Sequence, residues 1–159
     1  MNYDKKQLLG MLASQLERKS SGIARAANNA RQDAINAEGR MQTRYGSEKE
    51  ESGYLADGLN LRRNEVEQGL STLLALQLPE NPSKVMSGSL VSIRDGSEVE
   101  YYFILPYGGG ESIETDQGEV TVINPTAPIA KLMLNKKVGE QFPFRRGAFE
   151  DKYTILDIK

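Results

Sequence analysis

Early in the chain, apolar and small side chains recur at alternating spacings of three and four residues. This heptad-type spacing places them on one face of a single long helix. The positions are Leu9, Ala13, Leu16, Ser20, Ile23, Ala27, Ala30, Ala34, Ala37 and Met41. A second series, interrupted by Arg62 and Arg63, predicts a second helix and consists of Leu55, Leu59, Val66, Leu70, Leu73 and then Leu76 or Gln77.

The segment between the two series is polar and reads YGSEKEESGY, residues 45–54. Gly46 and Gly53 are weak helix formers at either end of it. No proline occurs before Pro79, so nothing in this part of the sequence interrupts a long helix. The pattern therefore predicts an antiparallel coiled-coil hairpin over residues 1–78, with its tip near residues 44–54.

From Pro79 onward the pattern changes to short β-branched and aromatic segments that are separated by glycine and proline. Such segments are typical of strands and turns. A hairpin turn is expected at Asp95-Gly96, and the glycine-rich segment 106–113 is expected to be a loop. The predicted strands are 89–94, 98–106, 118–124, 140–144 and 152–159.

A short helix is predicted at residues 128–134, with Pro128 in its first turn and Thr126 as its cap. Together these elements predict an α+β fold. The N-terminal antiparallel coiled-coil hairpin would be followed, over residues 79–159, by a mostly antiparallel sheet domain with one short helix.

Composition narrows the possible chemistry. The 159 residues include no His, Cys or Trp, which excludes a Ser-His-Asp or Cys-His mechanism, a disulfide and a Cys/His zinc site within this chain. The 20 basic and 22 acidic residues give a net charge of −2, which argues against a surface coated with basic charge for nucleic acid. No apolar run approaches the roughly 20 residues that span a bilayer, so we expect a cytoplasmic protein with no membrane contact.

The segment 126–144, TAPIAKLMLNKKVGEQFPF, carries the most specific motif in the chain. It begins with Pro128, Ile129, Ala130 and Lys131, continues with Leu134, Asn135 and Lys136, and ends with Gly139 and Glu140. This motif resembles the C-terminal domain of the Gre family of bacterial transcription elongation factors. Asn135 stands where that family usually has glycine, and both residue types tolerate a positive φ at a helix end.

The order of the parts also resembles the Gre family, in which an antiparallel coiled coil precedes an FKBP-like domain. The resemblance implies a partner, RNA polymerase, whose secondary channel would receive the coiled coil. Nascent RNA would then be reached only indirectly, through the polymerase. The chain would not itself be an enzyme and would have no cofactor of its own. We expect it to be a monomer.

The predicted tip is similar to the Gre motif Gly-Asp-x-Lys-Glu-Asn-x-Glu-Tyr. Gly46, Lys49, Glu50 and Tyr54 match it in register, whereas Ser47 replaces the aspartate. By resemblance, Glu50 is a candidate ligand for a Mg²⁺ ion shared with the polymerase, and Glu48 and Glu51 are candidates to assist it. The resemblance also implies that the following residues contact the partner: Ser47, Lys49 and Tyr54 in the tip, and Pro128, Ile129, Lys131 and Lys136 in the C-terminal motif.

Several interpretations remain open at this stage. The factor could stimulate cleavage of backtracked RNA, or it could occupy the channel without supporting cleavage, because a hydroxyl at Ser47 is a poor substitute for a carboxylate. The acidic tip could also be an ordinary solvated helix start. Outside this family, the alternatives are an FKBP-like peptidyl-prolyl isomerase or chaperone module and a plain coiled-coil adaptor.

Overall fold

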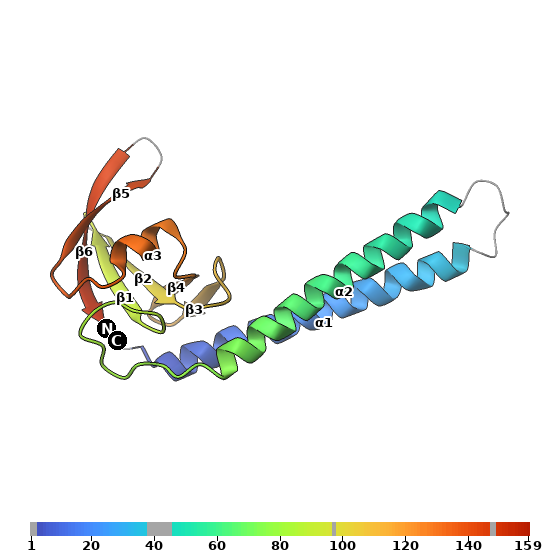
Figure 1. The fold of residues 1–159 in the computed structure, drawn as a ribbon. Coiled ribbons are helices and arrows are strands. Elements are labelled where there is room, and N and C mark those ends of the chain that lie inside the picture. Colours follow the sequence, from blue (N-terminus) through green and yellow to red (C-terminus); the bar gives the residue numbers. More distant parts are fainter. Residues whose placement is uncertain (1–2, 38–45, 97, 147–148) are drawn as a thin grey trace. The chain divides into compact units, whose positions relative to one another are not determined.

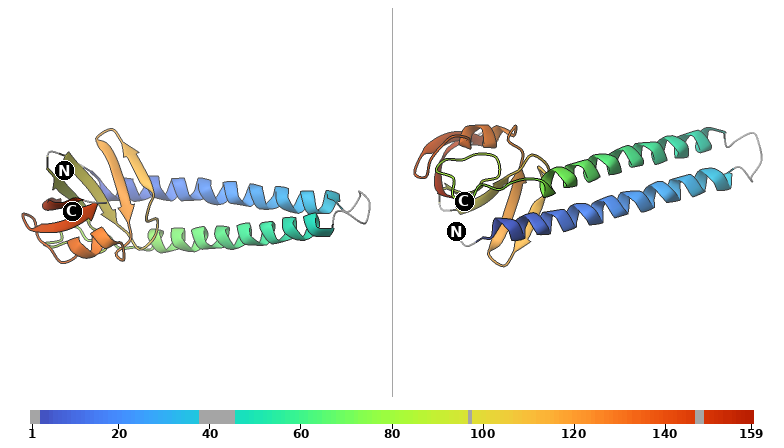
Figure 2. Two further views of the ribbon diagram at one scale, coloured as in Figure 1. Left: turned by 90° about the horizontal axis from the view of Figure 1, so that it is seen from above. Right: turned by 60° about the horizontal axis from the view of Figure 1, so that its bottom comes forward.

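The computed structural model describes residues 3–37, 46–96, 98–146 and 149–159. Two long helices come first, α1 over Lys5–Ala37 and α2 over Gly46–Leu74. They run antiparallel and side by side (Figures 1 and 2). The predicted helical hairpin is therefore confirmed. No helix in these described stretches combines the length and apolar character needed to cross a membrane.

Asp4 caps the start of α1. The backbone N–H of Lys6 donates to the Asp4 carboxylate at 2.9 Å, and the N–H of Leu8 donates to the Asp4 carbonyl oxygen at 3.0 Å. An aspartate in this position satisfies helix N–H groups that would otherwise lack partners, which typically stabilises a helix by about 1 kcal/mol. Asp4 thus fixes where the first helix begins.

The first predicted series of helix-facing residues is largely confirmed. Leu16, Ser20, Ala27 and Ala30 are buried in the hairpin, although Leu9 and Ile23 are only half-buried. The side chains of the last three members of the series, Ala34, Ala37 and Met41, lie outside the described residues. Because alanine supplies much of this buried face, the hairpin seam buries little apolar area per turn.

The second series was predicted one residue out of register at its start. Leu55 is 58% exposed, whereas Ala56 is 1% exposed and faces the seam. The helix-facing positions from there are Ala56, Leu59, Arg63 and Val66, spaced by three, four and three residues. Because Arg63 occupies one of these positions, the regular spacing is not visible when only apolar residues are considered.

Arg63 forms an ion pair with Glu67, an exposed residue one turn further along α2. Its Nε lies 3.3 Å from Oε1 of Glu67, and the same carboxylate oxygen accepts a hydrogen bond of 3.2 Å from the Ser20 hydroxyl on α1. Polar residues at seam positions commonly fix the register of a coiled coil. Of these residues, Ser20 is buried in the seam, and its hydrogen bond to Glu67 joins α1 to α2.

In the described part of the chain, six strands form one sheet in the order β3-β4-β2-β1-β6-β5. The β2–β4 pair is parallel and the other four pairs are antiparallel, which confirms the mostly antiparallel α+β fold. The strands are β1 (Leu90–Asp95), β2 (Glu98–Ile104), β3 (Ser112–Thr115), β4 (Gly118–Ile123), β5 (Gln141–Arg146) and β6 (Phe149–Ile158). The predicted hairpin turn lies between Asp95 and Glu98, and its Gly96 has a φ of 55°.

The strand β3 was missed, because its residues fall partly in the segment predicted to be a loop. It is an edge strand of four residues, and among the described residues β4 alone pairs with it. The chain enters it through Gly108 and Gly110, whose φ angles of 85° and 92° favour glycine. The glycines therefore belong to the turn that leads into the strand and do not extend through it.

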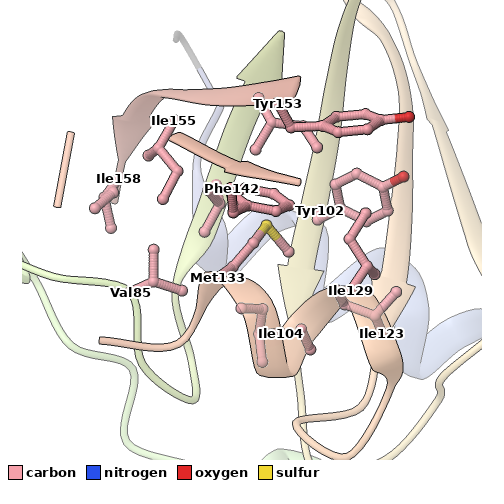
Figure 3. Close-up of a cluster of buried hydrophobic side chains, with 13 residues drawn as sticks. Val85, Tyr102, Ile104, Ile123, Ile129, Met133, Phe142, Tyr153, Ile155 and Ile158 are labelled. Atoms are coloured by element: carbon pink, nitrogen blue, oxygen red, sulfur yellow. The ribbon is translucent and has the colours of Figure 1, made fainter. Parts of the chain in front are cut away.

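One short helix, α3 (Pro128–Met133), packs on the sheet. Pro128 lies in its first turn as predicted, but the cap is Ala127 without a side-chain hydrogen bond, so the assignment of Thr126 was wrong. Fixing φ with proline pre-organises a helix start even without a capping side chain. Figure 3 shows Ile129 and Met133 of α3 meeting Tyr102, Phe142 and Tyr153 of the sheet in the core.

Asn135 ends this helical passage in the left-handed conformation, with a φ of 67°. Its N–H donates to the carbonyl oxygen of Val85 at 2.8 Å, and the N–H of Val85 donates to the carbonyl oxygen of Lys136 at the same distance. These two bonds attach the end of the helix to the segment that precedes β1. The backbone conformation agrees with the expectation that asparagine can stand where the Gre motif has glycine.

By packing, the chain divides into two compact units. One comprises Met1–Ala13 and Thr72–Lys159, and the other comprises Ser14–Ser71. The first turns of α1 join the sheet because Tyr3 contacts Tyr101 edge to face, with 5.0 Å between ring centroids. Leu12 also lies against Gly108. The division into domains after residue 78 stays a prediction.

We expect Asn135→Ala to lower the free energy of unfolding by about 1 kcal/mol, because alanine pays the steric cost of a positive φ. Asn135→Gly is the matched control and should leave stability unchanged or raise it slightly. Urea denaturation of the three proteins measures the difference. Equal midpoints for the alanine and glycine variants would contradict this account of the helix end.

The neighbours Leu73 and Leu74 test the register of α2. Leu73 is 0% exposed and Leu74 is 63% exposed. Leu73→Ala should therefore cost about 2–5 kcal/mol, whereas Leu74→Ala should stay within about 0.5 kcal/mol of wild type. Denaturant unfolding followed by circular dichroism compares them, and similar losses for both variants would show that the seam is wrongly placed.

Candidate functional site

The first candidate site is the start of α2. The backbone is helical from Gly46, so the motif at residues 46–54 occupies the first turns of a helix. The side chains of Ser47, Glu48, Lys49 and Glu50 lie outside the described residues, and their predicted roles stay predictions. Of the remaining motif residues, Glu51 is exposed and Tyr54 is 75% exposed.

The backbone nevertheless constrains where the motif positions lie. At 3.6 residues per turn, positions 47, 51 and 54 fall on one face of the helix, and position 50 lies close to that face. Three of the first six residues of α2 are glutamates. Carboxylates near a helix N-terminus interact favourably with the helix dipole, by about 0.3–1 kcal/mol each. The same acids that are candidate ligands therefore also favour the start of the helix.

The described residues contain no group of three or more acidic side chains that could together hold a metal ion. Glu51 is the one tip glutamate whose side chain is described, and it is exposed on the helix surface. Carboxylate oxygens are nevertheless the ligand type that Mg²⁺ prefers. The proposed role of the tip glutamates toward Mg²⁺ stays a prediction.

The second candidate site is the surface around α3. Pro128 and Lys131 are exposed and Lys136 is half-buried, so these three predicted contact residues are available to a partner. Ile129 is only 8% exposed and packs in the core with Tyr102 and Met133. Ile129 is therefore a core residue, and its side chain packs beneath the exposed surface of α3.

Two exposed apolar residues near these lysines were missed by sequence reasoning. Leu132, on α3, is 37% exposed, and Val138, just after it, is 55% exposed. The sequence did contain a signal for the exposure of Leu132, because its position on the helix is away from the face that carries Ile129 and Met133. Combined with the lysines, these side chains give the surface around α3 both apolar and positively charged character, which is suited to a protein partner with acidic and apolar groups.

Three solved structures resemble the chain at low identity. GreA factor homolog 1 of Thermus thermophilus is 17% identical, with 92% of this chain and 94% of that chain covered and a TM-score of 0.38. Its Thermus aquaticus counterpart is 16% identical, with 96% of this chain and 94% of that chain covered and a TM-score of 0.39. A GreA/GreB elongation factor from Nitrosomonas europaea is 15% identical, with 58% of this chain and 78% of that chain covered and a TM-score of 0.38. No curated protein sequence matches the chain.

The sequence comparison is more specific. The family model described as "Transcription elongation factor, GreA/GreB, C-term" matches residues 80–159. The match spans the whole six-stranded sheet, α3 and the motif at 126–144. Because it covers half of the chain, the chain belongs to the GreA/GreB family of transcription elongation factors.

Proposed function

We propose that this protein binds RNA polymerase and regulates transcript elongation by inserting its helical hairpin into the secondary channel. The observation that carries the proposal is the family match over residues 80–159 in a chain whose preceding residues form a long helical hairpin. At 1.5 Å per residue, the 33 residues of α1 extend about 50 Å. A hairpin of this length can reach a buried active centre while the sheet domain stays outside.

In this proposal the tip supplies carboxylates to a catalytic centre that belongs to the polymerase. Hydrolysis of a phosphodiester by two metal ions needs oxygen ligands to complete the Mg²⁺ shell. Glu50 is the proposed ligand because it matches the family motif in register, and Glu48 and Glu51 are its proposed helpers. The chain acts as a regulator and needs no His or Cys of its own.

Ser47 distinguishes this tip from the motif it resembles. A hydroxyl is neutral and is a weaker Mg²⁺ ligand than a carboxylate. We therefore propose that the protein supports transcript cleavage only weakly and acts mainly by occupying the channel. Lys49 and Tyr54 are proposed to contact the channel; the 75% exposure of Tyr54 makes that side chain available for such a contact.

The surface around α3 is the proposed docking site outside the channel. It offers the exposed Pro128 and Lys131, the half-buried Lys136 and the exposed apolar residues Leu132 and Val138.

Because the polymerase carries the RNA, the near-neutral net charge of −2 fits a protein that reaches nucleic acid only through its partner.

The tip chemistry is tested by transcript cleavage on stalled elongation complexes in the presence of Mg²⁺. Ser47→Asp should raise the cleavage rate by about tenfold or more, because a carboxylate that stabilises the transition state by about 1.4 kcal/mol has that effect. Glu50→Ala, introduced into the Ser47→Asp protein, should remove the gain. Asp57→Ala, an exposed acid further along α2, is the control and should change nothing. Equal cleavage with and without Glu50 would remove that residue from its proposed role.

The docking surface is tested by charge reversal. Lys131→Glu should weaken binding to RNA polymerase by about tenfold, because a complementary contact becomes a like-charge contact. Lys152→Glu on β6 is the matched control, since Lys152 is also exposed but lies outside the surface around α3. Affinity can be measured by fluorescence anisotropy of labelled protein. If both variants bind as well as wild type, the surface around α3 is not the docking site.

A further inference from the structure

A groove of about 730 Å³ lies where the start of α1 meets the segment that follows α2. Both parts belong to the compact unit that contains the sheet. The apolar residues that line the groove are half-buried, namely Leu9, Leu76, Leu78 and Pro79. Among the described residues, none from the tip motif or from the surface around α3 lines it, so the groove is separate from both candidate sites.

Lys5 lines this groove and is held in a defined position. Its Nζ donates a hydrogen bond to the backbone carbonyl oxygen of Pro79. Pro79 is itself fixed, because its ring packs so closely on Gly88 that an added Cβ there would come within 2.7 Å of the proline Cδ. A lysine usually keeps its ammonium in water and free to move, whereas Lys5 is half-buried. Its amine is therefore fixed at the wall of a groove that is open to small molecules.

The surroundings of Lys5 favour its neutral, nucleophilic form. Burial lowers the pKa of its ammonium below the ordinary value; the Glu80 carboxylate partly opposes this change, and the charge of Lys159 adds to it. Only an unprotonated amine has the lone pair needed to attack a carbonyl carbon. The fixed position and the local charges thus act in the same direction, and both make this amine more reactive than an exposed lysine.

The groove also attracts anions. Lys6 and Lys159 line it together with the acids Asp4 and Glu80. The Asp4 carboxylate accepts a hydrogen bond from the N–H of Lys6 at the start of α1, where the partial positive charge of the helix end offsets part of its own charge. Even with Lys5 unprotonated, a small excess of positive charge therefore remains, and it favours a negatively charged reactant.

From this arrangement we propose that Lys5 is a modification site at which an acyl phosphate transfers its acyl group to the side-chain amine. The Lys5 nitrogen attacks the acyl carbon, and a C–N bond forms as the bond from that carbon to the phosphate oxygen breaks. Phosphate leaves with the electron pair, and the amine proton passes to water. The apolar wall accommodates the acyl chain, while Lys6 and Lys159 attract the phosphate. The product is a neutral amide, so the hydrogen bond to Pro79 loses its charge.

The test treats the full chain with acetyl phosphate and follows the acetylation of each lysine by peptide mass spectrometry. We expect Lys5 to react several-fold faster than Lys136, the matched control, which is also half-buried but lies outside the groove. The preference should disappear in denaturant, because it depends on the folded groove. Equal rates at the two lysines in the folded protein, or an unchanged preference in denaturant, would overturn the proposal.

A second donor and two variants test the role of the phosphate. p-Nitrophenyl acetate carries the same acyl group without a charge, and it should show a smaller preference for Lys5. Lys6→Gln combined with Lys159→Gln should lower, several-fold, the rate of Lys5 with acetyl phosphate relative to its rate with the neutral ester. Lys152→Gln is the control, because Lys152 is exposed and lies outside the groove.

Circular dichroism verifies that each variant is folded. The same preference for Lys5 from both donors would contradict the proposal, because the phosphate would then play no part in recognition. A rate ratio that the double variant leaves unchanged, or that Lys152→Gln lowers equally, would contradict it as well.

Discussion

The pairing of β1 with β6 is the interaction on which the rest of the sheet domain depends. Leu90 and the last residue, Lys159, exchange two backbone hydrogen bonds of 2.8 Å, and the ladder continues along both strands. This pairing closes a long stretch of chain and places β1 between β2 and β6, with Leu90, Val91 and Ile93 fully buried. Val91 and Ile93 of β1 and Ile155 and Ile158 of β6 all belong to the core on which α3 packs. The position of the surface around α3 therefore follows from contacts between segments that are distant in sequence.

The hairpin is organised differently. Alanine supplies much of its buried face, and the Ser20–Glu67 hydrogen bond joins the two helices beside that face. The first turns of α1 belong to the compact unit of the sheet, because Tyr3 and Leu12 pack there. The unit that contains these turns also contains residues 80–159, which match the Gre family.

Much of the fold followed from sequence, and the failures have physical reasons. Periodicity predicted both helices, because repeated spacing over many residues outweighs single exceptions, but it misplaced Leu55 because Arg63 occupies a seam position. The edge strand β3 was missed because it is short and follows glycines. At the candidate sites, the motif around Pro128 and Lys131 was found from sequence alone. The exposed Leu132 was not, since its exposure depends on which face of α3 tertiary packing leaves open.

The central claim is that the hairpin tip enters the secondary channel of RNA polymerase. The most direct measurement is site-specific crosslinking from a photoreactive residue at position 54, where Tyr54 is 75% exposed, with position 152 as the matched control. With polymerase in excess, we expect position 54 to crosslink to polymerase residues that line the channel near its catalytic centre, and position 152 not to do so. A stable complex in which position 54 crosslinks only to the outer surface of the polymerase would contradict the account.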